Sequence, residues 1–260
     1  MVDLLSCMRE EYYLCGVKGE FEAEGSQLEE LMRLKEVTMK AGVGLTVKIG
    51  GCEAITDMNL SRSIGAAQIV APMIESAYAA KKFVGAAGLV FPPDELSEVE
   101  LLINVETAVG VSNFDDILAL PQAKKLAGLD IGRVDLAGSM GLLPEQCNSR
   151  EVYDACLNIC SKWVKAFPDK ECTLGGFLNP DTIKFLQEIS KTVKVGCESK
   201  KTIFSPQAIG ENLLRGAYLK AIEFEQIWYE NCMERYSRLS SENWGYFKAL
   251  GSYKQSIEQL

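Results

Sequence analysis

The chain has 260 residues, of which 47% are hydrophobic, and its formal net charge is −9. Sequence-independent binding to nucleic acid depends on Lys and Arg at phosphates, so this charge balance argues against a nucleic-acid partner. No apolar run approaches the roughly 18 residues that span a membrane, and the N-terminus lacks the basic start and apolar block of a signal peptide. We therefore expect a cytoplasmic protein without membrane contact, of a length that suits one α/β barrel.

The sequence contains no histidine and nine cysteines. Catalysis by Ser-His-Asp or Cys-His is therefore excluded, and the usual imidazole ligands of zinc and non-haem iron are missing. Acid–base work falls to carboxylates, Lys, Tyr, Cys or water. A metal site built mainly from carboxylates favours Mg or Mn. The cysteines are odd in number and form no C-x-x-C pair, which indicates thiols in a reducing compartment.

Short β-like runs alternate with helical patterns, which is typical of βαβ units and a mostly parallel sheet. The predicted strands are Val17–Glu22, Leu45–Ile49, Ala67–Ala71, Leu101–Glu106, Leu129–Asp135, Glu171–Gly175 and Thr192–Gly196, with Gly88–Phe91 as a weaker eighth. The predicted helices are Ser26–Ala41, Thr56–Ile64, Ser76–Gly85, Asn113–Leu118, Arg150–Ala166 and Pro180–Ile189. These elements predict a (β/α)8 TIM-type barrel as the catalytic domain, over residues 1–205.

The remaining residues, 206–260, predict a C-terminal helical extension. We expect two helices, about 207–232 and 236–258, which are rich in aromatic residues from Tyr218 to Tyr253. These helices either pack against the outer helices of the barrel or contact a neighbouring subunit, since aromatic residues suit the core of an interface.

Four predicted strands place charged side chains near their C-terminal ends, where barrel enzymes have their active sites. Side chains of equal parity share one face of a strand, so the members of each group point the same way. The groups are Lys18, Glu20 and Glu22; Thr46 and Lys48; Asn104 and Glu106; and Arg133 and Asp135.

Glu106 and Asp135 each end a strongly apolar strand and precede a glycine-containing turn. Two carboxylates in this position can ligate Mg or Mn and leave open positions for a substrate carboxylate and ketone oxygen. The metal would then stabilise an enolate as its negative charge develops.

Lys48 and Arg133 are the candidates to bind a substrate carboxylate or to polarise its carbonyl. Gly50 and Gly51 follow Lys48 directly, and glycines let backbone amides approach an anion closely.

At these residues the sequence resembles the HpcH/HpaI aldolase and citrate lyase beta-subunit family, in the pyruvate/phosphoenolpyruvate barrel superfamily. The matching segments are Thr46–Gly50, Ile69–Ser76, Ile103–Thr107 and Ile131–Gly141, in family order. The resemblance implies metal ligation by Glu106 and Asp135, and aldol or Claisen-type carbon–carbon chemistry on a 2-oxo acid or related carboxylate. It also implies a homo-oligomer, because a closing C-terminal helix of the family commonly packs on a neighbouring subunit.

The chain departs from the family in several places. Lys48 stands where the family usually has arginine, and lysine lacks the bidentate geometry with which arginine binds a carboxylate. Arg133 stands where the family more often has a small residue or proline. The segment 19–24 lacks the histidine of the pyruvate aldolases, so Glu20 or Glu22 would act as a base through water. Few residues precede the first predicted strand, so we expect an atypical first strand and an unusual barrel closure.

The leading hypothesis is thus a metal-dependent carbon–carbon lyase or synthase. A second hypothesis makes Lys48 a Schiff-base nucleophile whose pKa is lowered by Arg133. A third is a non-catalytic barrel that binds a ligand or acts as a scaffold, because the family's histidine and arginine are missing.

Overall fold

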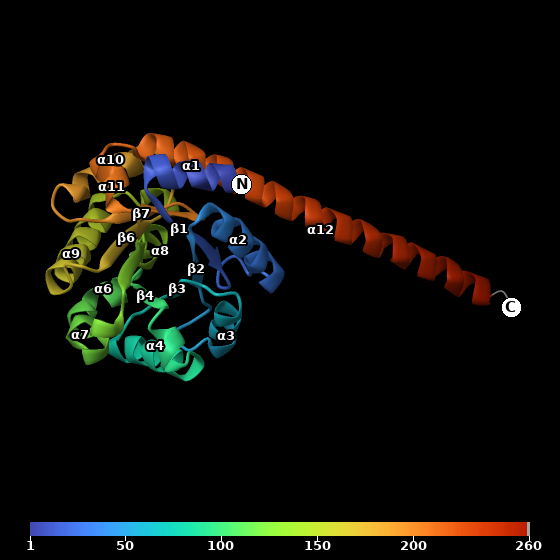
Figure 1. Cartoon of the computed structure of the whole chain (residues 1–260), viewed down its shortest axis with the longest axis horizontal. Helices are drawn as coiled ribbons and strands as arrows, with labels where there is room; N and C mark the ends of the chain where they lie inside the picture. The colour runs from blue at the N-terminus through green and yellow to red at the C-terminus, as the bar shows by residue number, and fades with distance from the viewer. Residues whose placement is uncertain (259–260) are drawn as a thin grey trace.

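Eight strands close into one barrel in the order of the sequence, which confirms the predicted fold class (Figure 1). The computed structural model describes residues 1–258. The strands are β1 (Leu14–Glu20), β2 (Gly44–Lys48), β3 (Gln68–Ala71), β4 (Glu100–Asn104), β5 (Gly128–Gly132), β6 (Glu171–Gly175), β7 (Gly196–Glu198) and β8 (Thr202–Phe204). Strands β1 to β7 run parallel to one another, and β8 is antiparallel to both β7 and β1.

The closure of the barrel is unusual, as expected: the last strand is antiparallel to both neighbours, and the pairing of the first strand with it shifts register between Leu14 and Gly16. Strands β7 and β8 form a tight hairpin in which Glu198 pairs with Ile203. The predicted eighth strand at Gly88–Phe91 is wrong, because Val90 ends a helix and Phe91 caps it. This short apolar run is the last turn of an apolar helix, and a run of that length does not distinguish a strand from a buried helix.

The predicted strand Leu129–Asp135 is also wrong at its end. Strand β5 stops at Gly132, and Arg133–Ser139 forms a helix, α8. Asp135 therefore lies in the first turn of a helix, where the helix dipole favours a carboxylate. Arg133 and Asp135 do not share a strand face.

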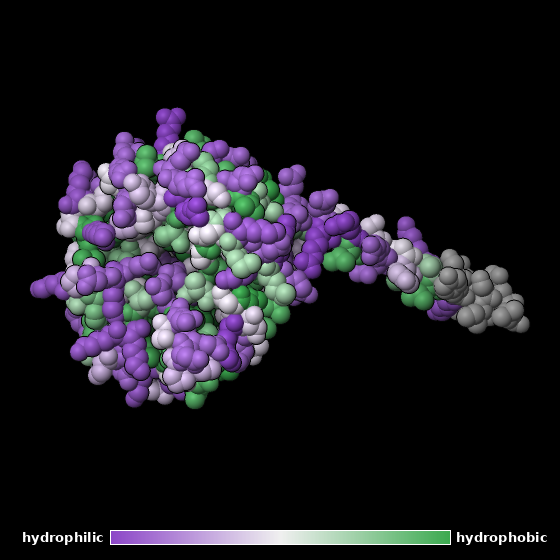
Figure 2. Space-filling model, in the orientation of Figure 1, coloured by the Kyte–Doolittle hydropathy of each residue, from purple (hydrophilic) through white to green (hydrophobic). Residues whose placement is uncertain are grey.

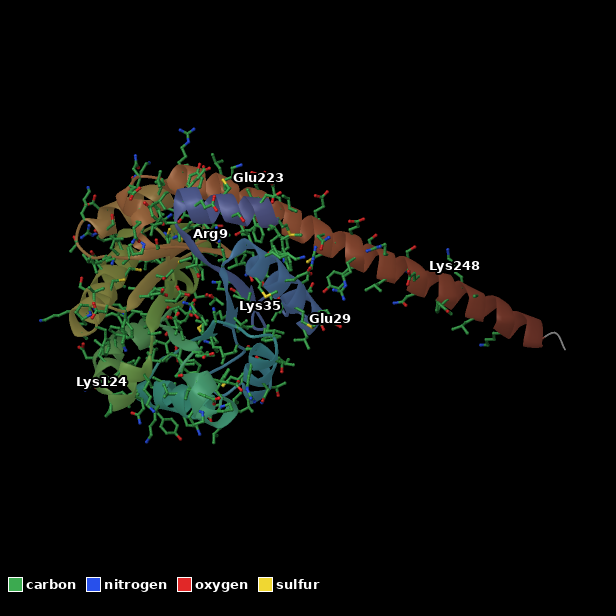
Figure 3. All side chains as sticks on the ribbon, viewed as in Figure 1. Arg9, Glu29, Lys35, Lys124, Glu223 and Lys248 are labelled. Carbon is green, nitrogen blue, oxygen red and sulfur yellow. The ribbon has the colours of Figure 1, made fainter. Side chains whose placement is uncertain are left out.

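Helices surround the barrel and cover its apolar strands. They are α1 (Val2–Tyr12), α2 (Leu28–Ala41), α3 (Ile55–Ser63), α4 (Ala77–Val90), α5 (Pro93–Leu96), α6 (Ala108–Ser112), α7 (Phe114–Ala119), η1 (Pro121–Lys125), α8, η2 (Pro144–Gln146), α9 (Arg150–Ala166), α10 (Pro180–Ser190), α11 (Pro206–Gly210) and α12 (Leu214–Glu258). Helix α1 precedes the first strand and packs against α2 and α12. Arg9, labelled in Figure 3, donates to the carbonyl of Ala41 at 2.8 Å and fixes α1 to the end of α2.

After the short helix α11, the tail forms one long helix, α12, in place of the two predicted helices. Its first turns lie on the barrel, and the remainder extends far beyond it (Figure 1). Residues 259–260 and the side chain of Tyr253, all part of the predicted tail, lie outside the described residues. Within the part of the chain that is described, no helix is long and apolar enough to cross a membrane.

Candidate active site

A cavity of about 580 Å³ opens at the C-terminal ends of the strands. Five of the residues predicted for the site line this cavity, namely Glu20, Glu22, Lys48, Glu106 and Asp135. The predicted site residues Gly50, Gly51 and Arg133 are not part of its lining. The cavity is therefore the candidate active site, and its geometry decides what each side chain can do.

Glu106 follows β4 and lies almost completely buried at the base of the cavity. Its Oε1 accepts hydrogen bonds from the Met73 amide at 3.2 Å and from Lys48 Nζ at 3.3 Å, and its Oε2 accepts one from Asn104 Nδ2 at 2.9 Å. Burial raises the pKa of Glu106; the charge of Lys48 opposes this shift, and that of Asp135 adds to it. The carboxylate thus sits where a positive charge would stabilise it.

Glu106 and Asp135 come together across Gly132. A Cβ atom on Gly132 would collide with Glu106 Oε2 and would lie 3.4 Å from Asp135 Oδ2. The absence of that Cβ leaves the space between the two carboxylates, and magnesium sites commonly use one or two carboxylates with water and substrate. Residues 1–258 contain no group of three or more His, Cys, Asp or Glu side chains arranged to hold a metal. Glu106 and Asp135 therefore fit Mg or Mn, with these two carboxylates as protein ligands and the remaining coordination positions left to other oxygen atoms.

Lys48 lies between two carboxylates at the end of β2. Its Nζ is 3.1 Å from Glu22 Oε2 and 3.3 Å from Glu106 Oε1. Burial lowers the pKa of Lys48, but the charges of Glu106 and Glu22 outweigh it, so the pKa is raised. The ammonium form is therefore favoured, which argues against the Schiff-base hypothesis.

A second ion-pair group fills the barrel interior beside the first. Lys18 Nζ lies 2.5 Å from Glu198 Oε1 and 3.4 Å from Glu20 Oε1, and Lys200 Nζ lies 3.1 Å from Glu20 Oε2. A Cβ on Gly175 would collide with Glu198 Oε1, so this glycine makes the space for that carboxylate. The pairs neutralise the lysines within the site.

The cavity as a whole carries an excess of negative charge. Its lining contains three lysines and six carboxylates, which leaves a formal charge of −3. The lysines are Lys18, Lys48 and Lys200, and the carboxylates are Glu20, Glu22, Glu106, Asp135, Glu198 and Glu225. A divalent cation would reduce this excess to −1.

Arg133 lies outside the cavity, fully buried between the barrel and α10. Its Nε donates to the Gly175 carbonyl at 2.7 Å, its Nη1 to Asn148 Oδ1, and its Cζ lies 4.9 Å from the ring centroid of Phe185. Because α8 begins at Arg133, the side chain does not follow the strand parity on which its predicted role depended.

The Gly50 amide is also engaged, since it donates to Asp57 Oδ2 at 2.7 Å. It therefore has no free N–H for a substrate anion, and Gly51 lies outside the cavity lining beside it. The glycine pair forms the turn into α3 rather than part of the cavity wall.

Sequence reasoning missed Asp130, Glu198 and Lys200. Asp130 occupies an inward position of β5, which the alternating pattern of Leu129 and Ile131 could have indicated. Glu198 and Lys200 were missed because the seventh strand was predicted too early, at Thr192–Gly196, and no element was predicted for the hairpin that carries them.

The HpcH/HpaI aldolase/citrate lyase family model matches residues 31–204, which is more than half of the chain. No curated protein matches the sequence. Among solved structures, the HpcH/HpaI aldolase from Desulfitobacterium hafniense DCB-2 has a TM-score of 0.61 at 16% identity, with 85% of this chain and 88% of that chain covered.

Two further structures show the same fold. An HpcH/HpaI aldolase/citrate lyase family protein from Burkholderia cenocepacia J2315 has a TM-score of 0.59 at 17% identity, covering 85% of this chain and 90% of its own. The citrate synthase SbnG has a TM-score of 0.57 at 16% identity, covering 86% of this chain and 100% of its own. At these identities the structures establish the fold alone, whereas the family match establishes the relationship. The chain belongs to the HpcH/HpaI aldolase/citrate lyase family.

Proposed function

We propose that the protein is a metal-dependent carbon–carbon lyase or synthase, similar to an aldolase or citrate lyase. It would act through an enolate of a 2-oxo acid or a related carboxylate. The observation that carries this proposal is the pair Glu106 and Asp135, which face one another across Gly132 at the mouth of the barrel. Membership of an aldolase and citrate lyase family supports the reaction class.

Glu106 and Asp135 would hold Mg or Mn. A divalent metal there supplies Lewis-acid polarisation of a substrate carbonyl. Two observations support a cation at this place. The cavity lining has an excess of three negative charges, and the Glu106 carboxylate is buried and repelled by Asp135.

Lys48 would bind the carboxylate of the substrate. Its side chain is nearly buried, and the raised pKa keeps its ammonium charged. When Glu106 serves as a metal ligand, the ammonium retains only Glu22 as an anionic partner and can accept a second one. A lysine holds that carboxylate as a point charge, without the bidentate geometry of arginine.

Glu22 would move the proton that the missing histidine moves in related aldolases. Its side chain is 25% exposed, lines the cavity and is held 3.1 Å from Lys48, so a water molecule can reach its free oxygen. Glu20 suits another role, because it lies deeper between Lys18 and Lys200. Burial raises its pKa, but these two charges outweigh that effect and lower it. Glu20 therefore remains ionised and keeps both lysines in place.

We further assign catalysis to residues 1–205, and a contact role within a homo-oligomer to residues 206–260. The nine cysteines are all free, which suits the reducing cytoplasm.

The experiment is titration calorimetry of metal-free protein with Mn²⁺, followed by pyruvate or oxaloacetate. We expect the wild type to bind Mn²⁺ and then to bind the oxo acid more tightly, and Asp135→Asn to lose both effects. Asp115→Asn is the matched control, since Asp115 also lies in the first turn of a helix but is exposed and far from the cavity lining. Unchanged Mn²⁺ binding by Asp135→Asn would refute the metal site and favour the non-catalytic barrel.

A further inference from the structure

The candidate active site has one apolar wall. Its side chains come from the start of α8, from the residues after β6 and from α12: Val134, Phe177, Leu178 and Ile222. Phe177 is 44% exposed and Ile222 39%, in a cavity otherwise lined mainly by charged and polar side chains. Figure 2 shows hydrophobic residues between hydrophilic ones elsewhere on the surface, and single exposed apolar residues are ordinary. Four that share one wall of a cavity indicate a site for an apolar group.

The barrel register places this apolar wall beside the two carboxylates that would hold the metal. The last residues of β5 and β6 pair with one another, and Val134 and Phe177 each follow two residues later. The last residue of β5 is Gly132, the glycine between Glu106 and Asp135. An apolar group that packs on this wall therefore lies next to the carboxylate pair.

The group proposed to hold the substrate carboxylate lies across the barrel from the apolar wall. Lys48 ends β2, and β2 is opposite β6 in the closed order of the eight strands. The carboxylate pair comes from the end of β4 and the start of α8, between these two sides. A substrate that binds Lys48 and reacts beside the carboxylate pair thus has its second partner on the side of Phe177 and Ile222.

The lysines that line the cavity have no place for a second anionic group. Lys18 Nζ lies 2.5 Å from Glu198 Oε1, and Lys200 Nζ lies 3.1 Å from Glu20 Oε2. Each of these ammonium groups is therefore already neutralised by a carboxylate of the protein. Lys48 can accept one substrate carboxylate, and the cavity lining contains no further Lys or Arg.

Carboxylates instead border the apolar wall. Glu225 lies one turn after Ile222 on α12 and lines the same cavity. It accepts hydrogen bonds from Ser199 Oγ and from the Lys201 amide, the latter at 2.9 Å, and forms no ion pair in the described part of the chain. Asp135 adds a second negative charge on this side. An anion at the wall would be repelled by both carboxylates, whereas an uncharged apolar chain would not.

We propose that the second partner of the reaction is an uncharged aldehyde whose apolar chain packs against the apolar wall. This inference rests on the proposed function and names the partner of its enolate. In the aldol direction, carbon 3 of pyruvate loses a proton and forms a bond to the aldehyde carbon, and the aldehyde oxygen takes up a proton. The product is a 4-hydroxy-2-oxo acid with one carboxylate and an apolar tail. A citrate-type reaction differs, because both of its partners carry carboxylates.

The first test compares pentanal with 5-oxopentanoate, in which a carboxylate replaces the terminal methyl group of the same chain. Each is supplied with pyruvate and Mg²⁺, and the product is measured by mass spectrometry. We expect pentanal to react at least about 10-fold faster, because bringing like charges together costs free energy. Each methylene group added from ethanal to pentanal should raise kcat/KM by about two- to fourfold, as its burial is partial or complete.

Enolate formation is measured separately, by NMR, as exchange of the pyruvate methyl protons in D₂O without any aldehyde. Exchange together with equal or better use of 5-oxopentanoate would overturn the inference and leave the proposed function intact. Absence of exchange would refute the proposed function, and the assignment of an aldehyde partner with it.

The second test changes the charge preference of the wall. Phe177→Lys should raise the use of 5-oxopentanoate relative to pentanal by about 10-fold or more, and Ile222→Lys tests the same wall from α12. Leu89→Lys is the matched control, since Leu89 is 84% exposed on α4 and outside the cavity lining. The ratio of the two rates is taken within each protein, so a general loss of activity does not imitate the effect. Ratios equal to that of the control in both wall variants contradict the inference.

A third measurement examines the wall without metal or reaction. Saturation-transfer NMR detects weak binding of pentan-1-ol, which has the same chain as pentanal but no carbonyl group. The signal should be present for the wild type and Leu89→Lys and should fall in Phe177→Lys and Ile222→Lys. Equal signals in all four proteins would refute the apolar wall as a binding surface, whatever the result of the pyruvate exchange.

Discussion

Glu106 and Asp135 approach Gly132 from two sides, and the missing side chain of that glycine forms the space between their carboxylates. A Cβ there would collide with Glu106 Oε2 and would lie 3.4 Å from Asp135 Oδ2. The residues are separated by 29 positions in the sequence and come from the end of β4 and the first turn of α8. The barrel register brings them together, because β4 and β5 are hydrogen-bonded neighbours.

Gly132→Ala should weaken Mn²⁺ binding by about 10- to 100-fold, the range found when residues that orient metal ligands are changed. The backbone of Gly132 has φ −76° and ψ 98°, which alanine can adopt, so Glu106 should shift while the fold remains. Titration calorimetry measures the effect. Gly138→Ala, in the helix that follows Gly132, is the control, since its Cβ would meet nothing within 4 Å. Equal affinities for the two variants would contradict the assigned site.

Lys48→Met should lower the free energy of unfolding by about 3–5 kcal/mol, because it leaves Glu106 buried without its cationic partner. Saturating Mn²⁺ should restore part of the loss, since the metal supplies the missing positive charge. Urea unfolding with and without Mn²⁺ measures both effects. Lys40→Met breaks only the exposed pair with Glu36 and should cost less than about 1 kcal/mol. A Lys48→Met protein as stable as this control would show that the buried pair is dispensable.

Asp130→Asn should change how stability depends on pH. Asp130 is buried in β5, its Oδ1 has no hydrogen-bond partner among the described residues, and burial together with Glu198 raises its pKa well above the usual 3.8. A carboxyl group with a raised folded-state pKa stabilises the fold below its unfolded pKa, and this contribution is lost as pH rises through the folded pKa. The asparagine variant has no ionisable group at this position, so its free energy of unfolding does not fall with rising pH for this reason.

The free energy of unfolding of Asp130→Asn should therefore exceed that of the wild type increasingly as pH rises from about 4 to 7. Urea unfolding over that pH range tests the difference, with the exposed Asp169→Asn as a control that should follow the wild type. Parallel curves for wild type and Asp130→Asn would contradict the raised pKa.

Treatment with pyruvate and borohydride should add no mass at Lys48. The charges of Glu106 and Glu22 raise the pKa of its ammonium despite burial, so the neutral amine needed for attack on a carbonyl is scarce. Peptide mass spectrometry measures the outcome, with an established Schiff-base aldolase treated in parallel to show that trapping works. A modified Lys48 would restore the Schiff-base hypothesis.

Local patterns accounted for much of the fold. The apolar run that ends at Glu106 forms β4 and the residues directly after it. Asn179-Pro180 starts α10, and the Asn179 side chain caps this helix by accepting a hydrogen bond from the Thr182 amide. One error lay where an element changes type within a short segment. Between Leu129 and Leu136, charged residues occur on both sides of Gly132, so no break in an apolar run marks the change from β5 to α8.

The sequence by itself determined the barrel, the family and the strand-end carboxylates, because hydrophobic periodicity, caps and motifs act over a few residues. The tertiary structure decided which charges meet. Lys18 and Glu198 are 180 positions apart and pair only because β8 closes the barrel, while Arg133 turns away from the cavity because its helix begins there. The tertiary structure also decided that α12 is one helix with an uncovered face, because the barrel ends in space before the helix does.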